Sequence, residues 1–218
     1  MDAKERIARR VALEVKPNTL VNLGIGMPTM VANFLPADVH VFFQSENGVV
    51  GMGARPPEGF EDPNLTDAGG GFVSAVPGAA SIDSAMSFGL IRGGHLDMTV
   101  LGGLQVDEQG RLANWMVPGK MVPGMGGAMD LVSGAKRVIV AMAHTAKGKP
   151  KIVPECTLPL TSLRRVSLVV TELAVIEPTD NGLVLREKAE GVTTDEIVAA
   201  TTAKLIITDD VAEMTLAA

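Results

Sequence analysis

The sequence predicts an α/β fold with an open, mostly parallel sheet flanked by helices. Its 218 residues are 46% hydrophobic and 20% charged, a composition that builds a core and differs from that of disordered chains. The opening alternates helix, strand, glycine turn, helix and strand, which is the order of a parallel α/β sheet. Glycine-rich loops then follow apolar strands. We therefore expect one domain over residues 1–218.

The chain is expected to open with a helix capped by Asp2, because Ile7, Val11 and Val15 recur on one helical face. Pro17 then ends this helix. The next elements are predicted as a strand at Thr19–Leu23, a turn at Gly24–Pro28, a helix at Thr29–Leu35, a strand at Val39–Gln44, a long loop at 51–71, a helix at Ser81–Ile91 capped by Ser81, and a strand at Met98–Leu101.

The second half of the chain is richer in strands. After a glycine-dense stretch at residues 116–127, strands are predicted at Val138–Met142, Ser167–Thr171, Leu173–Ile176, Leu183–Arg186 and Leu205–Thr208, with a helix from Thr193 or Thr194 to about Ala203. The turn-rich EPTDNG between residues 176 and 183 favours a hairpin there. Because ligands of open α/β sheets bind at the carboxyl ends of strands, the glycine-rich loops are where chemistry is expected.

Composition and charge argue against several classes of function. The net charge is −6, and with one Trp and no Tyr there is little to stack on bases, so we expect no nucleic-acid partner. The single cysteine, Cys156, rules out a disulfide within the chain and lacks the sequence context of a nucleophile. The charged start MDAKERIARR leads into no long apolar run, so we expect a cytoplasmic protein without a membrane segment.

The pentapeptide Gln44–Gly48 (QSENG) places a carboxylate, Glu46, between an apolar strand and an Asn-Gly turn. Such a turn bends sharply, so Glu46 would be held rigidly and partly desolvated. Carboxylates act as covalent nucleophiles in some enzymes, and desolvation favours that role. From these residues alone, a plain hairpin turn carrying a solvated Glu46 is the competing interpretation.

A resemblance over roughly residues 3–207 favours the catalytic interpretation. QSENG, followed by Val49 and Val50, resembles the active-site signature of family I CoA-transferases, in their β (B) subunit or in the C-terminal half of fused enzymes. Further blocks resemble the family in the same order: Asn22–Asn33, Arg92–Asp97, Gly102–Val106, Leu112–Trp115, Pro118–Val122 and Gly124–Leu131. The resemblance implies the CoA-transferase (NagB/RpiA-like) fold and a single CoA-transferase domain of the β (B) type.

The resemblance also implies a mechanism and a partner. Glu46 would attack an acyl-CoA and carry CoA as a glutamyl thioester in ping-pong chemistry. Gly127, with Gly126, would supply backbone N–H groups to the oxyanion. No cofactor is expected, because coenzyme A is itself a substrate. A CoA-transferase α (A) subunit would complete an α₂β₂ enzyme acting on acyl-CoA and carboxylic acids.

Other residues are candidates for binding substrate or CoA: Gly24, Gly26, Asn47, Gly48, Gln105 and Lys120. The Gly24-Ile25-Gly26 turn is a weak signal for a phosphate loop and is expected to line the active site without holding phosphate. Lys120 could meet an acidic group of the substrate or remain solvated, and Asn114 is expected to make structural hydrogen bonds. The three histidines lie far apart in sequence, so no metal site is expected.

Two other functions and the identity of the acids stay open from the sequence. An aldose–ketose isomerase or amino-sugar deaminase of related fold would give QSENG no role, and a non-catalytic effector sensor would leave Glu46 free to vary. The blocks at 102–105 and 122–127 resemble the acetoacetate and 3-oxoacid branch of the family more than the 3-oxoadipate branch. Acetoacetate, succinate, acetate or butyrate could each be a substrate.

Overall fold

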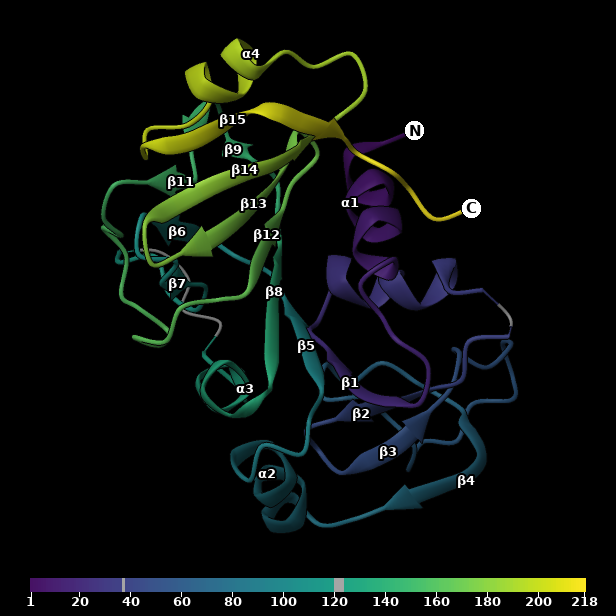
Figure 1. Ribbon diagram of the computed structural model, residues 1–218. Coiled ribbons are helices and arrows are strands. Elements are labelled where there is room, and N and C mark those ends of the chain that lie inside the picture. Colours follow the sequence, from purple (N-terminus) through teal and green to yellow (C-terminus); the bar gives the residue numbers. More distant parts are fainter. Residues whose placement is uncertain (37, 120–123) are drawn as a thin grey trace.

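A computed structural model describes residues 1–36, 38–119 and 124–218 of the chain. Its central element is a ten-stranded mixed sheet (Figure 1). From one edge to the other the strands are β15 (Leu205–Glu213), β14 (Gly182–Lys188), β13 (Ala174–Thr179), β12 (Leu168–Val170), β8 (Arg137–Ala141), β5 (Met98–Leu101), β1 (Thr19–Leu23), β2 (Val41–Ser45), β3 (Val49–Met52) and β4 (Ala75–Ser81).

The five central strands, from β12 through β8, β5 and β1 to β2, all run parallel. Antiparallel hairpins extend this centre on both sides, with β3 and β4 after β2, and β13 and β14 after β12. The predicted mostly parallel α/β sheet is therefore confirmed. The parallel centre brings the carboxyl ends of β1, β2, β5 and β8 to one edge, where open α/β sheets bind ligands.

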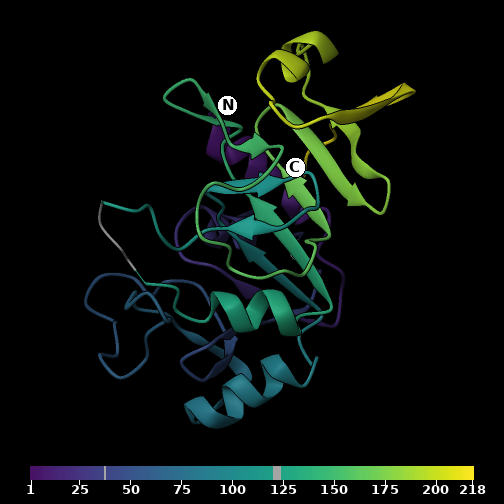
Figure 2. The same cartoon turned by 90° about the vertical axis from the view of Figure 1, so that its left-hand side faces the viewer.

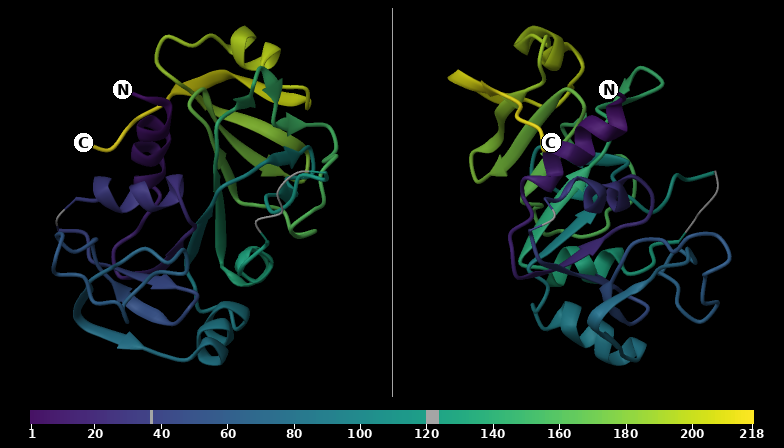
Figure 3. Two further views of the ribbon diagram at one scale, coloured as in Figure 1. Left: turned by 180° about the vertical axis from the view of Figure 1, so that it is seen from behind. Right: turned by 90° about the vertical axis from the view of Figure 1, so that its right-hand side faces the viewer.

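Two hydrophobic cores cover the two faces of the sheet. Alternate residues of β8 separate between them, because side chains of a strand point to opposite faces: Val138 and Val140 join one core, Ile139 and Ala141 the other. The second core packs under α1 (Ala3–Ala12) and the 3₁₀ helix η1 (Met27–Phe34), which lie together on one side of the sheet (Figure 3).

The first core packs under the remaining helices and a small sheet. The helices are α2 (Ser84–Arg92), α3 (Ala128–Gly134) and α4 (Thr194–Ala199). The small sheet joins β11 (Ile152–Val153), β6 (Gln105–Asp107) and β7 (Leu112–Ala113). A separate two-stranded hairpin pairs β9 (Thr145–Ala146) with β10 (Lys149–Pro150). The loop after β3 and residues 114–119 project from the same side of the molecule (Figures 2 and 3).

Most predicted elements of the sheet are present, and the departures have local causes. Asp2 caps α1 as predicted, its carboxylate accepting the N–H of Glu5 at 2.7 Å. The assignment of Ser81 as a helix cap is wrong, since Ser81 ends β4 and Asp83 caps α2 instead. The strand β4 has no sequence signal, because AVPGAAS contains Pro and Gly and most of its residues are exposed.

Candidate active site

Glu46 lies in the tight turn between β2 and β3. The N–H of Gly48 closes this turn by donating to the carbonyl of Ser45 at 2.9 Å. Gly48 has φ +121°, and a Cβ built on it would lie 2.0 Å from the carbonyl oxygen of Ile82. Only glycine fits such a backbone position. The turn therefore holds Glu46 at the carboxyl end of β2 with little freedom of the backbone around it.

A buried polar network orients the carboxylate of Glu46. Nδ2 of Asn22, in β1, donates to Oε2 of Glu46 at 3.2 Å and to Oε1 of Gln44 at 3.0 Å. The hydroxyl of Thr99, in β5, donates to Oδ1 of Asn22 at 3.2 Å, and Nε2 of Gln44 donates to Ser87 at 2.8 Å. Buried polar groups are retained when each finds a partner. The network thus fixes one carboxylate oxygen.

The other side of the carboxylate faces the glycine turn before α3. A Cβ added to Gly127 would lie 3.3 Å from Cγ and 3.5 Å from Oε1 of Glu46, and 3.4 Å from the ring of Phe88. Gly126 has φ +49°. A side chain at residue 127 would therefore crowd both Glu46 and Phe88, so the backbone of Gly127 lies close to the carboxylate.

A cavity of 510 Å³ opens in front of Glu46. Apart from Glu46 and Asn114, it is lined by glycines and apolar residues. These are Gly24, Ile25, Ala68, Leu101, Gly102, Gly103, Leu104, Gly124, Met125, Gly126, Gly127, Ala128 and Leu131. Because β1, β2 and β5 are parallel neighbours, the loops that follow them come together at this cavity. They supply Gly24, Glu46 and Gly102 among its lining residues.

Four predicted site residues meet in this cavity, namely Glu46, Gly24, Gly126 and Gly127. Asn114 lines it too, but both ends of its amide are engaged: Nδ2 donates to the carbonyl of Gly102 at 3.2 Å, and Oδ1 accepts from Thr161 at 2.7 Å. That arrangement agrees with the structural role expected for Asn114.

The structure places three other predicted residues in supporting positions outside the cavity lining. Gly26 caps the start of η1 and has φ +86°. Asn47 donates to the carbonyl of Thr66 at 2.7 Å and so ties the long loop to the hairpin. Gly48 closes the Glu46 turn, as described above. These residues shape the loops around the cavity.

Gln105 is likewise absent from the cavity lining. Its Oε1 accepts backbone N–H bonds from Thr157 at 2.9 Å and Leu158 at 3.0 Å, and its Nε2 donates to the Thr157 hydroxyl at 3.0 Å. Its amide is therefore engaged in holding residues 157–158. The remaining candidate, Lys120, lies outside the residues that the structure describes.

Sequence reasoning assigned no role to Asn22, although it is the residue that holds Glu46. A signal was present, because Asn22 interrupts the otherwise apolar Leu20–Leu23, where a fully buried polar side chain needs a specific partner. Thr99 is the same kind of residue in the buried strand β5. What the sequence could not show is that β1, β2 and β5 are neighbours.

Other reactive groups lie in environments that suppress their reactivity. Burial raises the pKa of the Cys156 thiol to about 12, so it is not a thiolate nucleophile at neutral pH.

Within the described ranges, no group of three His, Cys, Asp or Glu side chains is arranged to hold a metal ion. No helix in those ranges is both long and apolar enough to cross a bilayer.

Comparison with known proteins identifies the group to which this site belongs. The chain is 55% identical over 215 residues to the β subunit of the acetate CoA-transferase of Haemophilus influenzae, covering 98% of this chain and 96% of the relative. It is 50% identical over 211 residues to the B subunit of the probable succinyl-CoA:3-ketoacid coenzyme A transferase of Bacillus subtilis, covering 96% and 98%.

The fold has a solved counterpart. The apoenzyme of the acyl-CoA transferase YdiF from Escherichia coli O157:H7 superposes with a TM-score of 0.78 at 22% identity. This chain is covered over 98% of its length and spans 43% of that larger chain. The sequence model described as coenzyme A transferase matches residues 4–200. From this match and the identities to its relatives, the chain belongs to the coenzyme A transferase family.

Proposed function

We propose that this chain is the subunit that carries the nucleophile of a CoA-transferase, and that Glu46 transfers CoA through a glutamyl-CoA thioester. The observation that supports this most is the position of Glu46, held by Asn22 at the wall of a cavity and faced by the Gly127 backbone. A solvated turn glutamate would need none of these contacts. An isomerase would need an acid/base pair and a phosphate site, whereas Glu46 is the one titratable side chain among the described residues that line the cavity.

The proposed reaction has four steps. Glu46 attacks the carbonyl carbon of an acyl-CoA, which forms an acyl-glutamyl anhydride and releases CoA thiolate. The thiolate attacks the Glu46 carbonyl of the anhydride, which releases the first acid as a carboxylate and leaves the glutamyl-CoA thioester. The acceptor carboxylate then runs the two steps in reverse. No net proton transfer is needed, so a catalytic histidine is not required.

The geometry of the site supports this sequence of steps. Asn22 donates to Oε2, so Oε1, on the Gly127 side, is the oxygen proposed to attack. Each tetrahedral intermediate carries an oxyanion, and one well-placed donor is typically worth about 10²–10³ in rate. The backbone N–H groups of Gly126 and Gly127 are the proposed donors, because both residues line the cavity and neither has a side chain in the way.

Short-chain acids and 3-oxoacids are the proposed substrates. The cavity is lined by small and apolar groups, including Ala68, Leu101 and Leu104, which suits a short hydrocarbon chain. The two relatives described above carry the names of an acetate and a succinyl-CoA:3-ketoacid enzyme. A panel of acetate, butyrate, succinate and acetoacetate, assayed as acceptors, separates these possibilities.

A partner of the α type is part of this proposal. Both relatives are named as one subunit of a larger enzyme, of the β or B type, which supports an α-subunit partner for this chain as well. Ile25 is 70% exposed and Met125 38% exposed at the rim of the cavity, and Phe60 on the loop after β3 is 81% exposed. Exposed apolar groups around a site favour burial in a complex. We propose an α₂β₂ assembly that acts in the cytoplasm.

Trapping the intermediate tests the proposed role of Glu46. The assembled enzyme is incubated with acyl-CoA and then with borohydride, which reduces a glutamyl thioester to an alcohol and inactivates the protein. Peptide mass spectrometry should find the change at Glu46 and at no other carboxylate. Glu46→Gln should resist the treatment, and Glu58→Gln, an exposed glutamate on the long loop, should react like the wild type. Reduction elsewhere, or none, contradicts the proposal.

A further inference from the structure

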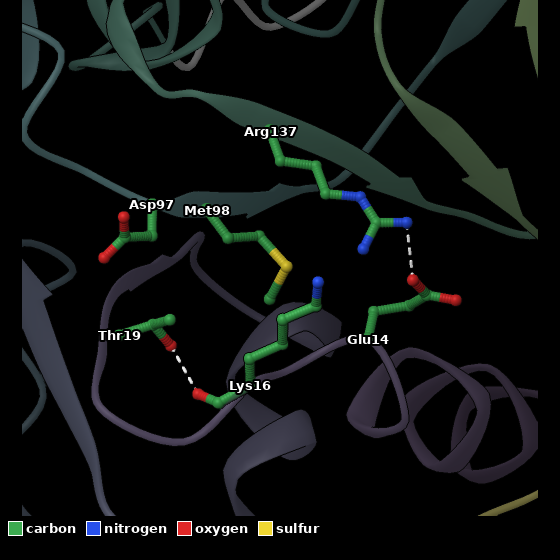
Figure 4. A pocket seen from close by; sticks show the side chains of 6 residues that line it. All are labelled: Glu14, Lys16, Thr19, Asp97, Met98 and Arg137. Carbon is green, nitrogen blue, oxygen red and sulfur yellow. Dashed lines mark hydrogen bonds and ion pairs between the residues drawn. The ribbon is translucent and has the colours of Figure 1, made fainter.

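A second cavity, of 440 Å³, lies at the ends of the parallel strands opposite to Glu46 (Figure 4). Three of its residues begin parallel strands, Thr19 in β1, Met98 in β5 and Arg137 in β8, so the cavity lies at the amino ends of the strands whose carboxyl ends form the active site. Its lining is Glu14, Lys16, Thr19, Asp97, Met98 and Arg137.

The carboxylate of Glu14 is fully engaged by protein cations. Its Oε1 accepts from Nη1 of Arg10 at 2.7 Å, and its Oε2 pairs with Nη2 of Arg137 at 2.5 Å. Arg10 in turn forms two bonds of 2.7 Å with Glu187. Burial alone would raise the pKa of Glu14, but the hydrogen bond from Arg10 and the charge of Arg137 bring that pKa below its ordinary value. Glu14 therefore stays ionised and has no oxygen free for a ligand cation.

Asp97 is engaged in the same way. Nζ of Lys136 donates to its Oδ1 at 2.7 Å, and the backbone N–H of Leu20 donates to its Oδ2 at 2.9 Å. These two hydrogen bonds hold the pKa of Asp97 below its ordinary value. Both acidic residues of the cavity are thus already compensated, Asp97 by Lys136 and Glu14 by Arg10 and Arg137.

The two cations that line the cavity, Lys16 and Arg137, keep N–H groups that no carboxylate of the described residues accepts. Within the part of the chain that the structure describes, Lys16 forms no ion pair, and Arg137 uses only Nη2. In Figure 4 the ammonium of Lys16 points into the space beside Met98, and a second terminal nitrogen of Arg137 is directed into the same space. An ammonium has three donors and a guanidinium five, so unused N–H groups converge there.

The balance of charged side chains around the cavity indicates which ligand charge it would favour. Four cations meet three carboxylates in this cluster, which leaves one surplus positive charge. The cations are Arg10, Lys16, Lys136 and Arg137, and the carboxylates are Glu14, Asp97 and Glu187. The side chain of Met98, only 4% exposed, gives the cavity an apolar contact surface.

We propose that this cavity binds a small organic monoanion, a carboxylate whose oxygens accept from Lys16 and Arg137 and whose short hydrocarbon part packs against Met98. One surplus charge matches a carboxylate better than a doubly charged phosphate, and the thioether of Met98 gives a hydrocarbon chain something to contact. The cations are partly exposed, so the attraction is screened and binding in the millimolar range, about 4 kcal/mol, is expected.

Methyl NMR of the full chain tests this site directly. The chain is labelled with ¹³C at the methionine methyl groups, the Met98 signal is assigned with Met98→Leu, and butyrate is titrated at constant ionic strength. The Met98 signal should shift and saturate. Lys16→Gln should weaken this binding about tenfold, the loss expected for a charge-assisted contact, whereas Lys4→Gln, an exposed lysine away from the cavity, should leave it unchanged.

Three controls decide whether the site is what we propose. Glu46→Gln should leave the Met98 titration unaltered, because the two cavities lie at opposite ends of the strands. Chloride and inorganic phosphate at equal ionic strength should shift Met98 less than butyrate does and should not compete with it. An unmoved Met98 signal, an equal response to chloride, tighter binding of phosphate, or unchanged affinity in Lys16→Gln each overturns the proposal.

Discussion

At the scale of single residues, the site depends on placing one carboxylate oxygen. Asn22 holds Oε2 of Glu46, and the Gly127 backbone lies beside Oε1. Asn22 is itself fixed by Thr99 and Gln44, so the proposed nucleophile is held by buried hydrogen bonds from three neighbouring parallel strands. Reactivity should therefore be sensitive to changes in position as well as in charge.

Glu46→Gln should keep the fold, because the change is nearly isosteric, and lose transfer by many orders of magnitude. Glu46→Asp should also be nearly inactive, since a nucleophile withdrawn by about 1 Å loses roughly 10²-fold or more. Steady-state transfer assays measure both, with intact mass checked for deamidation of Gln back to Glu. Activity above about a tenth of wild type in either variant would show that Glu46 is not the nucleophile, since the chemical step is expected to fall by far more.

Asn22→Ala should reduce kcat by about 10- to 100-fold while leaving KM for acyl-CoA nearly constant, because it frees the nucleophile without removing a contact to CoA. Thr99→Val is the matched control, since it removes the hydroxyl that supports Asn22 but leaves the amide donors, and it should have a smaller effect. The kcat and KM values of the three proteins are compared. An effect confined to KM would show that Asn22 does not position Glu46.

At the scale of elements, His144 joins segments that follow β8, β12 and α4. Its Nδ1 and Nε2 each lie 2.9 Å from a threonine hydroxyl, Thr171 and Thr201. Thr171 already accepts two backbone N–H bonds at 3.2 and 3.0 Å, and Thr201 donates to a backbone carbonyl at 2.7 Å. Thr201 therefore accepts from Nε2–H. The lowered pKa of the ring leaves Nδ1 unprotonated, so Nδ1 accepts from the Thr171 hydroxyl, whose proton has the carbonyl of Ala174 at 3.1 Å as its other acceptor.

The neutral ring of His144 predicts how stability depends on pH. Burial, together with the charge of Lys151, lowers its pKa to about 4. The unfolded chain then binds this proton more readily than the folded chain, so the contribution is complete above about pH 6.5 and is lost as the pH falls toward 4. The expected loss is about 3 kcal/mol.

Urea unfolding between pH 7 and 4 measures this effect. His144→Gln should be less stable at pH 7 and should show a flatter decline with acid than the wild type. His40→Gln, which alters an exposed histidine, should follow the wild-type curve. An equal slope for His144→Gln and the wild type would mean that other groups cause the acid sensitivity.

At the scale of the whole molecule, some of the exposed apolar groups lie around the cavity that contains Glu46 and on the loop after β3. Ile25, Phe60 and Met125 are the examples described above. A monomer that exposes such groups around its active site is expected to bury them against a partner. These exposed groups therefore support the proposal that a different chain completes the active site.

The isolated chain should show little transfer activity, and adding the α subunit should restore it. Light scattering should report a mass consistent with α₂β₂ for the mixture. Phe60→Ser should weaken the assembly while leaving the circular dichroism of the isolated chain unchanged, because Phe60 is exposed in it. Full activity of the chain alone would refute the half-enzyme proposal.

Removing metal ions should not affect the assembled enzyme. The thioester bond supplies the free energy of transfer, and Glu46 is the only carrier that the proposed steps require. Exhaustive dialysis against EDTA followed by the transfer assay is the measurement. A loss of activity that one divalent ion restores would show that the mechanism is incomplete.

What the sequence by itself determined is local in character. The apolar strands, the capped first helix, the hairpin of β13 and β14, and Glu46 in its signature all follow from residues close together in the chain. The segments that resemble the family predicted the chemistry, because their order and residue types can be read from the sequence alone. The edge strand β4 was missed, since its exposed AVPGAAS has no alternating pattern to detect.

Only the tertiary structure decided which polar residues meet. Asn22 and Thr99 look like isolated irregularities in apolar strands until the order β5-β1-β2 places them beside Glu46. Gln105 looks like a cavity residue until the fold gives its amide to residues 157 and 158. The cavity at Lys16 and Arg137 likewise exists because three parallel strands begin side by side. Strand order depends on long-range packing, and no local spacing encodes it.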